Sequence, residues 1–274
     1  GLTFYGRSGI FDALISANQT RLRDYKDGRG NVVKGSRVNQ DGYLVKLGIQ
    51  PHQDHRVELS YRREELDGDR SFRNEFAVQP LMDTQYHSDS WNLEYKGKNA
   101  GFADEIEFNA FHTKAQDHKR PLAVPRNPAA PNIRQGEVAL YGETTTLGSN
   151  LGFTSHINSQ LKLKYGLNWR RSEAENRTVH NQKKTDVGVY AEGIWNLDPV
   201  TLTTGVRYDR YSYHSSGGDK KSEGRINPSI GAVWNITPEF SLNAFYNTAS
   251  RSPRLNEAMI ASAVTRISPN LRRE

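Results

Sequence analysis

Apolar and polar side chains alternate with a period of two along most of this chain, which is the pattern of β-strands rather than of helices. In the segment at 43–50 the apolar side chains share one face, at Tyr43, Val45, Leu47 and Ile49. After a short polar turn at 51–55 the alternation resumes, with apolar positions at Val57, Leu59 and Tyr61. The two segments therefore predict a β-hairpin with one apolar face and one charged face.

The same alternation recurs through the rest of the sequence. Its other apolar sets fall within residues 91–95, 106–110, 147–157, 161–169, 187–197, 202–208, 230–236 and 242–246. We count about a dozen strands and expect each to run for roughly 9–13 residues, which is enough to cross a bilayer at a tilt.

The predicted connections alternate between short and long. Short turns are expected near residues 51–55, 97–102, 158–159, 197–200 and 236–239. Long polar segments lie between them, at about 24–42, 65–86, 114–137, 172–185 and 213–225. Outer-membrane barrels have this asymmetry, with short periplasmic turns and longer outer loops. The pattern therefore favours a transmembrane antiparallel β-barrel.

A soluble β-sandwich or a lipocalin-like barrel is the alternative interpretation, because either could place the charged faces in water. Strands of soluble sheets average about 5–6 residues, however, so the predicted strand length and the loop asymmetry favour the membrane. Aromatic residues near the predicted strand ends suit the interfacial girdles of a membrane barrel: Tyr43, Tyr61, Tyr95, Trp169, Trp195, Trp234 and Tyr246.

The composition excludes several other classes of protein. The mean hydropathy of −0.78 is very polar, but 13 Tyr, 10 Phe and 4 Trp argue against disorder. The absence of Cys excludes disulfides and thiolate chemistry. The net charge of +6 is not gathered into a basic run of five or more, so no nucleic-acid binding is expected. No apolar run is long enough for a membrane helix, and no signal peptide opens the sequence, so we expect a mature or trimmed chain.

A family resemblance adds to this reading. Residues 185–257 contain Gly-x-Arg-Tyr-Asp at 205–209, Asn-Pro-x-x-Gly at 227–231, a Thr-Pro turn at 237–238 and Ser-Arg-x-Pro at 250–253. This order resembles the central barrel of TonB-dependent receptors. The strand LKLKYGLNWRR at 161–171 is similar to another strand of that family, and DGYLVKLGI and SFRNEFAV further upstream resemble its FrpB-like (FetA-like) group.

The resemblance implies a barrel of about twenty-two strands that encloses an N-terminal plug. Residues 1–274 would then form an interior part of that barrel, about half of its wall, without the plug and without the closing strands. A closed barrel of about twelve strands is the less favoured alternative. The resemblance also implies a bacterial outer-membrane location, contact with lipid and lipopolysaccharide, coupling to TonB through the missing plug, and import of a ferric siderophore.

No enzyme motif or metal-binding motif occurs, so neither catalysis nor a resident cofactor is expected. His52, His55, His112 and His118 are expected to be solvated polar side chains near turns and loops. A ferric siderophore is bulky and often anionic, so Arg and Tyr side chains are the candidate contacts. Because successive side chains of a strand point to opposite faces, we expect six candidates to face the lumen: Arg62, Arg170, Arg207, Tyr211, Tyr213 and Arg251. Four more are expected on outer loops: Arg70, Arg73, Arg120 and Arg126.

Three other functions remain open. A haem receptor of the same fold would carry a ligating His between Phe-Arg-Ala-Pro and Asn-Pro-Asn-Leu elements. Here Ser250-Arg251-Ser252-Pro253 and Ser268-Pro269-Asn270-Leu271 stand at comparable places with no His between them, which favours a siderophore. A passive porin or a structural barrel would lack the plug, and the long predicted outer loops suit a ligand trap better than either.

Overall fold

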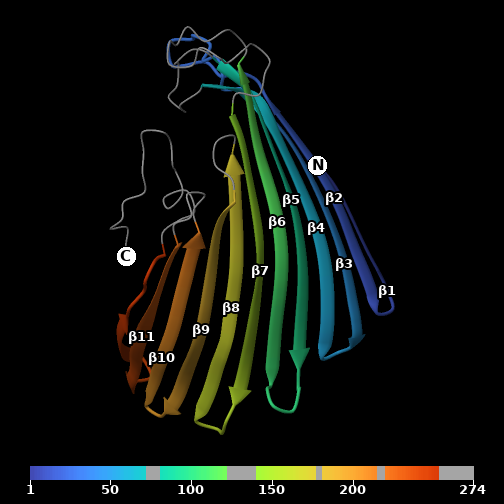
Figure 1. Cartoon of the computed structure of the whole chain (residues 1–274). Coiled ribbons are helices and arrows are strands. Elements are labelled where there is room, and N and C mark those ends of the chain that lie inside the picture. The colour runs from blue at the N-terminus through green and yellow to red at the C-terminus, as the bar shows by residue number, and fades with distance from the viewer. Residues whose placement is uncertain (72–80, 122–139, 177–180, 215–219, 253–274) are drawn as a thin grey trace.

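The chain folds into one curved antiparallel sheet in which every strand pairs with the next one in sequence (Figure 1). The computed structural model describes residues 1–71, 81–121, 140–176, 181–214 and 220–252. Within these residues the regular elements are twelve strands: β1 (Leu2–Ser8), β2 (Phe11–Leu22), β3 (Val38–His52), β4 (His55–Ser71), β5 (Leu81–Lys98), β6 (Glu105–Pro121), β7 (Leu140–His156), β8 (Leu161–Asn176), β9 (Gln182–Leu197), β10 (Val200–His214), β11 (Lys220–Thr237) and β12 (Phe240–Asn247). None of the described residues forms a helix long and apolar enough to cross a membrane.

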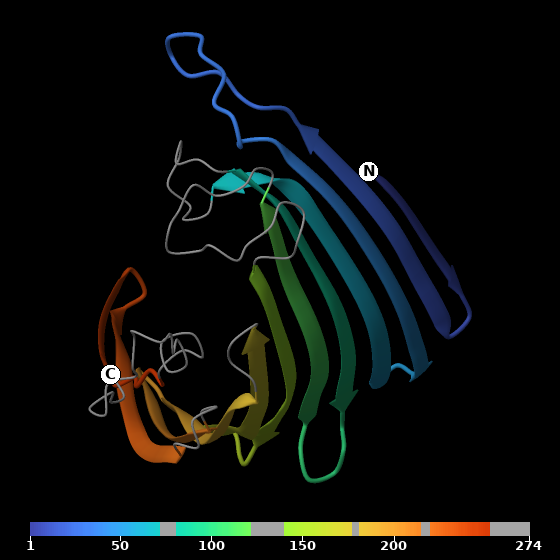
Figure 2. The same cartoon turned by 45° about the horizontal axis from the view of Figure 1, so that its top comes forward.

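The sheet is an open trough rather than a closed cylinder (Figure 2). Among the described strands, β1 pairs only with β2, and β12 pairs only with β11. The prediction of a partial barrel wall is therefore confirmed, and the alternative of a closed twelve-stranded barrel is not what the chain forms.

The strands are longer than the alternation predicted. From β3 to β11 they contain 15 to 18 residues. At roughly 3.3 Å per residue this is about 50–60 Å, well beyond the ~30 Å hydrocarbon core of a bilayer. The backbone ladder continues after the apolar alternation stops, since polar side chains can pair across strands in water.

This extension corrects the placement of two candidate ligand contacts. Arg70 lies in β4 and Arg120 lies in β6, so neither is on an outer loop as predicted. Arg73 and Arg126 lie outside the described residues.

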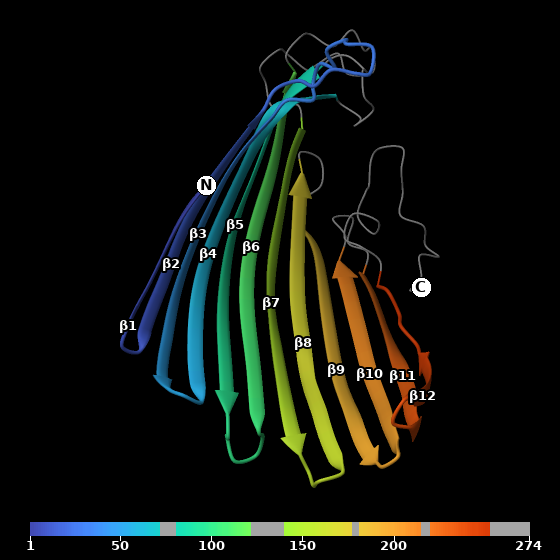
Figure 3. The same ribbon diagram turned by 180° about the vertical axis from the view of Figure 1, so that it is seen from behind.

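The two ends of the sheet differ, as predicted (Figure 3). The connections at residues 9–10, 53–54, 99–104, 157–160, 198–199 and 238–239 gather at one end. The opposite end carries the connections at 23–37, 72–80, 122–139, 177–181 and 215–219. Two of these, 177–181 and 215–219, are much shorter than the polar segments predicted there, because β8 to β11 take up the remaining residues. By the asymmetry of outer-membrane barrels, the short-turn end is the periplasmic one.

The distribution of apolar residues is inverted relative to a soluble protein. Large apolar side chains cover the outward face, and Leu47, Val189 and Ile230 are each more than half exposed. Among the described residues, the buried hydrophobic side chains are few: Met82, Ala103, Tyr211 and Tyr213. The inner, concave face is mostly polar. Contact between these apolar outward side chains and water would be unfavourable, so the outward surface of the wall must be covered by lipid.

Candidate functional site in the lumen wall

A ladder of asparagine side chains crosses the inner face from β8 to β5. The Asn168 Nδ2 donates to Asn150 Oδ1 at 2.8 Å, and Asn150 Nδ2 donates to Asn109 Oδ1 at 3.2 Å. Asn109 then donates to Asn92, and Asn92 Nδ2 donates to Glu94 Oε1 at 2.8 Å. The register sets Asn109, Asn150 and Asn168 directly opposite one another on successive strands. Each amide can therefore accept from one neighbour and donate to the next.

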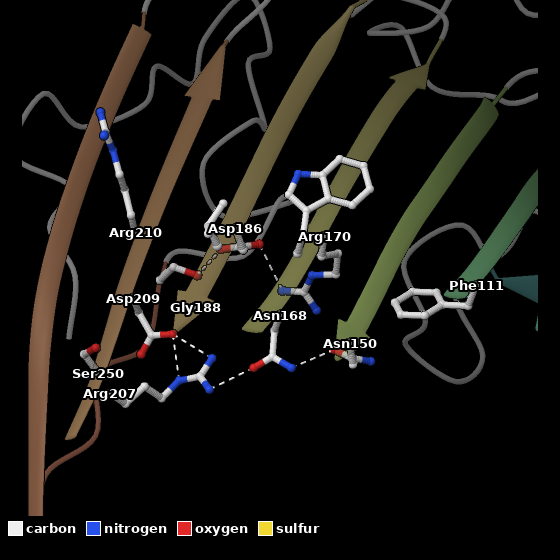
Figure 4. Close-up of a pocket in the computed structure, with 13 residues that line it drawn as sticks. Phe111, Asn150, Asn168, Arg170, Asp186, Gly188, Arg207, Asp209, Arg210 and Ser250 are labelled. Carbon is white, nitrogen blue, oxygen red and sulfur yellow. Dashed lines mark hydrogen bonds and ion pairs between the residues drawn. The ribbon is translucent and has the colours of Figure 1, made fainter. Parts of the chain in front are cut away.

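Arg207 on β10 extends this ladder by reaching across β9. Its NH1 donates to Asn168 Oδ1 at 2.9 Å, while its Nε and NH2 each lie 2.8 Å from Asp209 Oδ1 (Figure 4). Between Arg207 and Asn168 lies Gly188 of β9, where a Cβ atom would stand 2.1 Å from Arg207 NH2. The guanidinium can cross β9 only because this position has no side chain.

A second crossing of the same kind lies nearer the short turns. Arg56 on β4 passes over Gly48 of β3 and makes a bidentate pair with Asp12 of β2, at 2.7 and 2.9 Å. Its NH2 also contacts Glu58 Oε2 at 3.0 Å. In both cases an arginine and an acid two residues later face a glycine on the adjacent strand. We call this arrangement an arginine clasp.

The segment that follows β12 turns inward and is fixed to the lumen wall. Asn227 Nδ2 on β11 donates to Ser250 Oγ at 2.9 Å and to Asp209 Oδ2 at 3.1 Å. Ser252 Oγ donates to Asp186 Oδ1 at 3.0 Å and accepts from Lys184 Nζ at 2.7 Å. The two serines of the Ser-Arg-x-Pro sequence therefore tie this segment to β9 and β11.

These groups surround a cavity of about 500 Å³ that opens toward the lumen (Figure 4). Two Arg–Asp pairs flank it: Arg207 with Asp209, and Arg170 with Asp186 at 3.1 Å. The Phe111 ring lies over Gly148, where a Cβ atom would stand 2.4 Å from Cζ. The cavity therefore offers guanidinium donors, carboxylate acceptors and one aromatic ring. Its lining comprises Phe111, Asn150, Asn168, Arg170, Asp186, Gly188, Arg207, Asp209, Ser250 and Ser252, together with Trp169, Val187 and Arg210, whose side chains strand alternation turns outward.

The structure brings some of the proposed ligand contacts together and separates others. Arg170 and Arg207 line this one cavity, and their side chains are 53% and 39% exposed. Arg251 lies in the inward-turning segment beside it, between the two serines. Arg62 also lies on the inner face, but on β4, and sits 3.6 Å from Glu64.

Tyr211 and Tyr213 face inward on β10 but are buried, at 0% and 8% exposure. The Tyr211 hydroxyl donates to Glu223 Oε2 at 3.0 Å. Their rings serve the packing of the wall in this arrangement, rather than an open ligand surface.

The sequence analysis predicted neither the asparagine ladder nor the ion pair between Lys184 and Asp186. In this pair, Lys184 Nζ lies 3.0 Å from Asp186 Oδ1. The recurrence of Asn at lumen-facing parity was a usable signal for the ladder. His52 lies near His55 and His87 near His118, with ring centroids 6.1 and 6.2 Å apart, but no group of three or more potential metal ligands occurs in the part of the chain that the structure describes.

A long-stranded open wall with an apolar exterior, a polar interior and a cavity facing the lumen defines part of an outer-membrane β-barrel of the transporter type. Consistent with this class, the sequence profile of the family described as TonB dependent receptor-like, beta-barrel, matches residues 5–274. The chain belongs to this family, whose members are receptors and transporters in the outer membrane of Gram-negative bacteria.

Solved structures and curated sequences agree with this assignment. The FrpB iron transporter from Neisseria meningitidis (F3-3 variant) superposes with a TM-score of 0.80 at 29% identity, over 92% of this chain and 44% of the transporter. The copper transporter OprC, at 19% identity and a TM-score of 0.75, shares the fold. Heme/hemopexin utilization protein C of Haemophilus influenzae (strain 86-028NP) is 24% identical over 282 residues, which cover 86% of this chain and 39% of the relative. The chain thus spans less than half the length of these relatives.

Proposed function

We propose that this chain forms the central wall of an outer-membrane receptor that imports a ferric siderophore, driven by TonB acting through a plug domain. The observation that carries the proposal is the lumen cavity, where Arg170 and Arg207 stand beside an aromatic ring. An anionic, bulky chelate matches this combination of cationic donors and a flat apolar surface. The similarity to a protein described as an iron transporter supports iron as the cargo.

Arg170 is the better ligand contact of the two arginines. Within the described residues, only its NH2 makes a hydrogen bond, to Asp186 Oδ2. Arg207 already uses Nε, NH1 and NH2 in the clasp. A guanidinium has five N–H donors, so Arg170 keeps several for an incoming anion, whereas Arg207 would have to give up wall contacts.

Haem import is the second candidate, because the curated relatives are named for heme utilization. Haem also combines a flat ring with anionic carboxylates. The lack of His between Ser252 and Ser268 favours the siderophore.

The test is growth rescue of an iron-starved strain that lacks its own receptors and expresses the full-length receptor. Ferric catecholate, ferric hydroxamate or haem is supplied as the sole iron source, with and without TonB. Siderophore rescue that requires TonB is the expected result. Rescue by haem alone would replace the proposal with the second candidate, and TonB-independent rescue would indicate a passive pore.

Arg170→Gln provides the site-level test, with Arg171→Gln as a matched control. The two residues are adjacent on β8, but strand alternation turns Arg170 inward and Arg171 outward. We expect Arg170→Gln to weaken siderophore binding by about tenfold, since a charge-assisted contact contributes roughly 1.5 kcal/mol. Equal binding by both variants would remove Arg170 from the site.

A further inference from the structure

The connection between β2 and β3 folds into a small hairpin of its own, and we call residues 23–37 the outer hairpin. A β-bridge joins Lys26 to Val32, and Val33 N donates to Tyr25 O at 2.8 Å. Figure 2 shows the outer hairpin in blue, where it projects beyond the ends of β2 and β3. It lies at the end of the wall opposite the short periplasmic turns, so it faces the outside of the cell.

Two aspartates fix the backbone of the outer hairpin. At its tip, Asp27 Oδ1 accepts from the backbone amides two and four residues later, each at 2.9 Å. At its base, Asp24 Oδ1 accepts from the amides of Ser36 and Arg37, at 2.9 and 2.7 Å. A surface that is held in one conformation before it binds a partner has less conformational entropy to lose on binding. The outer hairpin is therefore preorganised for binding.

Cations outnumber these two carboxylates on the outer hairpin. It carries five exposed basic residues: Arg23, Lys26, Arg29, Lys34 and Arg37. Of these five, only Arg37 lies within ion-pair distance of a carboxylate among the described residues, at 3.7 Å from Asp69. The other four charged groups face water, where they are available to an anionic partner.

Two exposed side chains of another kind stand among these cations. Tyr25 is 52% exposed and Val32 is 53% exposed. Tyr and Arg are the residue types that most often dominate the energy of protein–protein interfaces, where apolar contacts at the centre are surrounded by a polar rim. Attraction of a simple polyanion would require only the cations. The combination of cations with Tyr25 and Val32 therefore fits the surface of another protein.

The outer hairpin is separate from the lumen site. Strands β4 to β8 lie between it and β9 in the order of the sheet, and none of its residues lines the cavity of Figure 4. Small ligands bind in concave sites, whereas this hairpin projects from the wall. A macromolecule is therefore a better match than the imported chelate.

From these features we infer that the outer hairpin binds an acidic protein outside the cell, at a surface where carboxylates surround an apolar patch. The four unpaired cations attract the carboxylates and speed the encounter. Tyr25 and Val32 then pack on the apolar patch, in contacts that salt does not screen. The inference does not depend on which ligand the receptor imports.

The test immobilises the full-length receptor in detergent and measures the binding of soluble polymers by biolayer interferometry at about 0.15 M salt. The probes are a random copolymer of glutamate and tyrosine, polyglutamate of the same length, and heparin as a carbohydrate polyanion. The charge variant Arg23→Gln/Lys26→Gln/Arg29→Gln/Lys34→Gln removes the four unpaired cations.

The matched control removes four outward cations from β8 to β11 at the same end of the wall, as Arg171→Gln/Lys183→Gln/Arg210→Gln/Lys220→Gln. Heat-modified mobility in gels verifies that each variant is folded. We expect the charge variant to lose about thirtyfold in affinity for the copolymer, as four exposed ion pairs would contribute, and the control to bind like the unmodified receptor. Tyr25→Ala should weaken copolymer binding about fivefold and leave polyglutamate binding unchanged.

Asp27→Ala separates a preorganised surface from general attraction between charges. This variant makes the outer hairpin more positive, so attraction alone would tighten binding. Loss of the hydrogen bonds at the tip should instead weaken copolymer binding several-fold. Tighter binding by Asp27→Ala, an equal loss in the matched control, or no copolymer binding by the unmodified receptor would each overturn the inference. Heparin binding as tight as copolymer binding would also overturn it, and would indicate a glycan partner instead.

Discussion

Gly188→Ala is the most direct test of the arginine clasp at β8 to β10. The added methyl group would lie 2.1 Å from Arg207 NH2 and 2.8 Å from Asp209 Oδ1. Both neighbours are ends of flexible side chains, so the strand itself need not move. The Arg207 guanidinium must instead move away from its position over β9, and it then loses its contacts with Asn168 and Asp209.

The expected loss in the free energy of unfolding depends on how exposed these groups are. Hydrogen bonds to charged groups contribute about 1.5–3 kcal/mol when buried. Arg207 and Asp209 are 39% and 17% exposed, and screening by water reduces each contact to about 1 kcal/mol. The two contacts then sum to about 2 kcal/mol. Because alanine is better than glycine in a strand by roughly 0.5–1 kcal/mol, the net loss should be about 1 kcal/mol.

The assay is a double-mutant cycle of Gly188→Ala and Arg207→Ala, measured by equilibrium urea unfolding of the full-length receptor in lipid vesicles. In the Arg207→Ala background, Gly188→Ala should be neutral or slightly stabilising, because nothing then needs to cross β9. Gly6→Ala is the control, since a Cβ there meets nothing within 4 Å. An equal loss from Gly188→Ala in both backgrounds would refute the clasp.

Two further predictions concern the faces and the turns of the wall. Tyr165→Asp places a charge against lipid and should destabilise the wall on the order of 2 kcal/mol. Asn168→Asp, in the wet lumen, still accepts from Arg207 but no longer donates to Asn150, and should cost about 1 kcal/mol, so equal effects on folding in liposomes would contradict the face assignment. Hydrogen bonds from the backbone amide and the ring of His156 lower the pKa of Asp104. This contact is therefore present above the ordinary carboxyl pKa of about 4 and is lost as the pH falls through the lowered value. The protection of amides 99–104 against hydrogen exchange, measured relative to their intrinsic exchange rates at each pH, should fall on acidification, and Asp104→Asn should abolish that pH dependence.

The alternation predicted the sheet, its faces and the class of barrel because lipid and water impose opposite demands on successive side chains. It predicted strand ends poorly, since β4 continues through the polar residues 62–71, where hydrogen bonding and not apolar packing holds the ladder. The first hairpin, β1 and β2, was missed, although Phe11, Ala13, Ile15 and Ala17 share one face of β2.

The candidate site was predicted only in part. Parity alone placed Arg170 and Arg207 toward the lumen. Their convergence on one cavity depends on a register that spans β7 to β11, which no single strand encodes. The inward turn at Ser250 and Ser252 likewise depends on partners 23 and 66 positions away.

The arginine clasps have a consequence for how this wall can change over evolutionary time. A glycine at position 188 or 48 is constrained by an arginine on the neighbouring strand, at 207 or 56. Replacing the glycine first destabilises the wall, because the new side chain displaces the arginine. Replacing the arginine with a smaller residue first removes this clash. Each pair should therefore be inherited as a unit, and lineages that replace the arginine with a small residue should be the ones in which the glycine is free to vary.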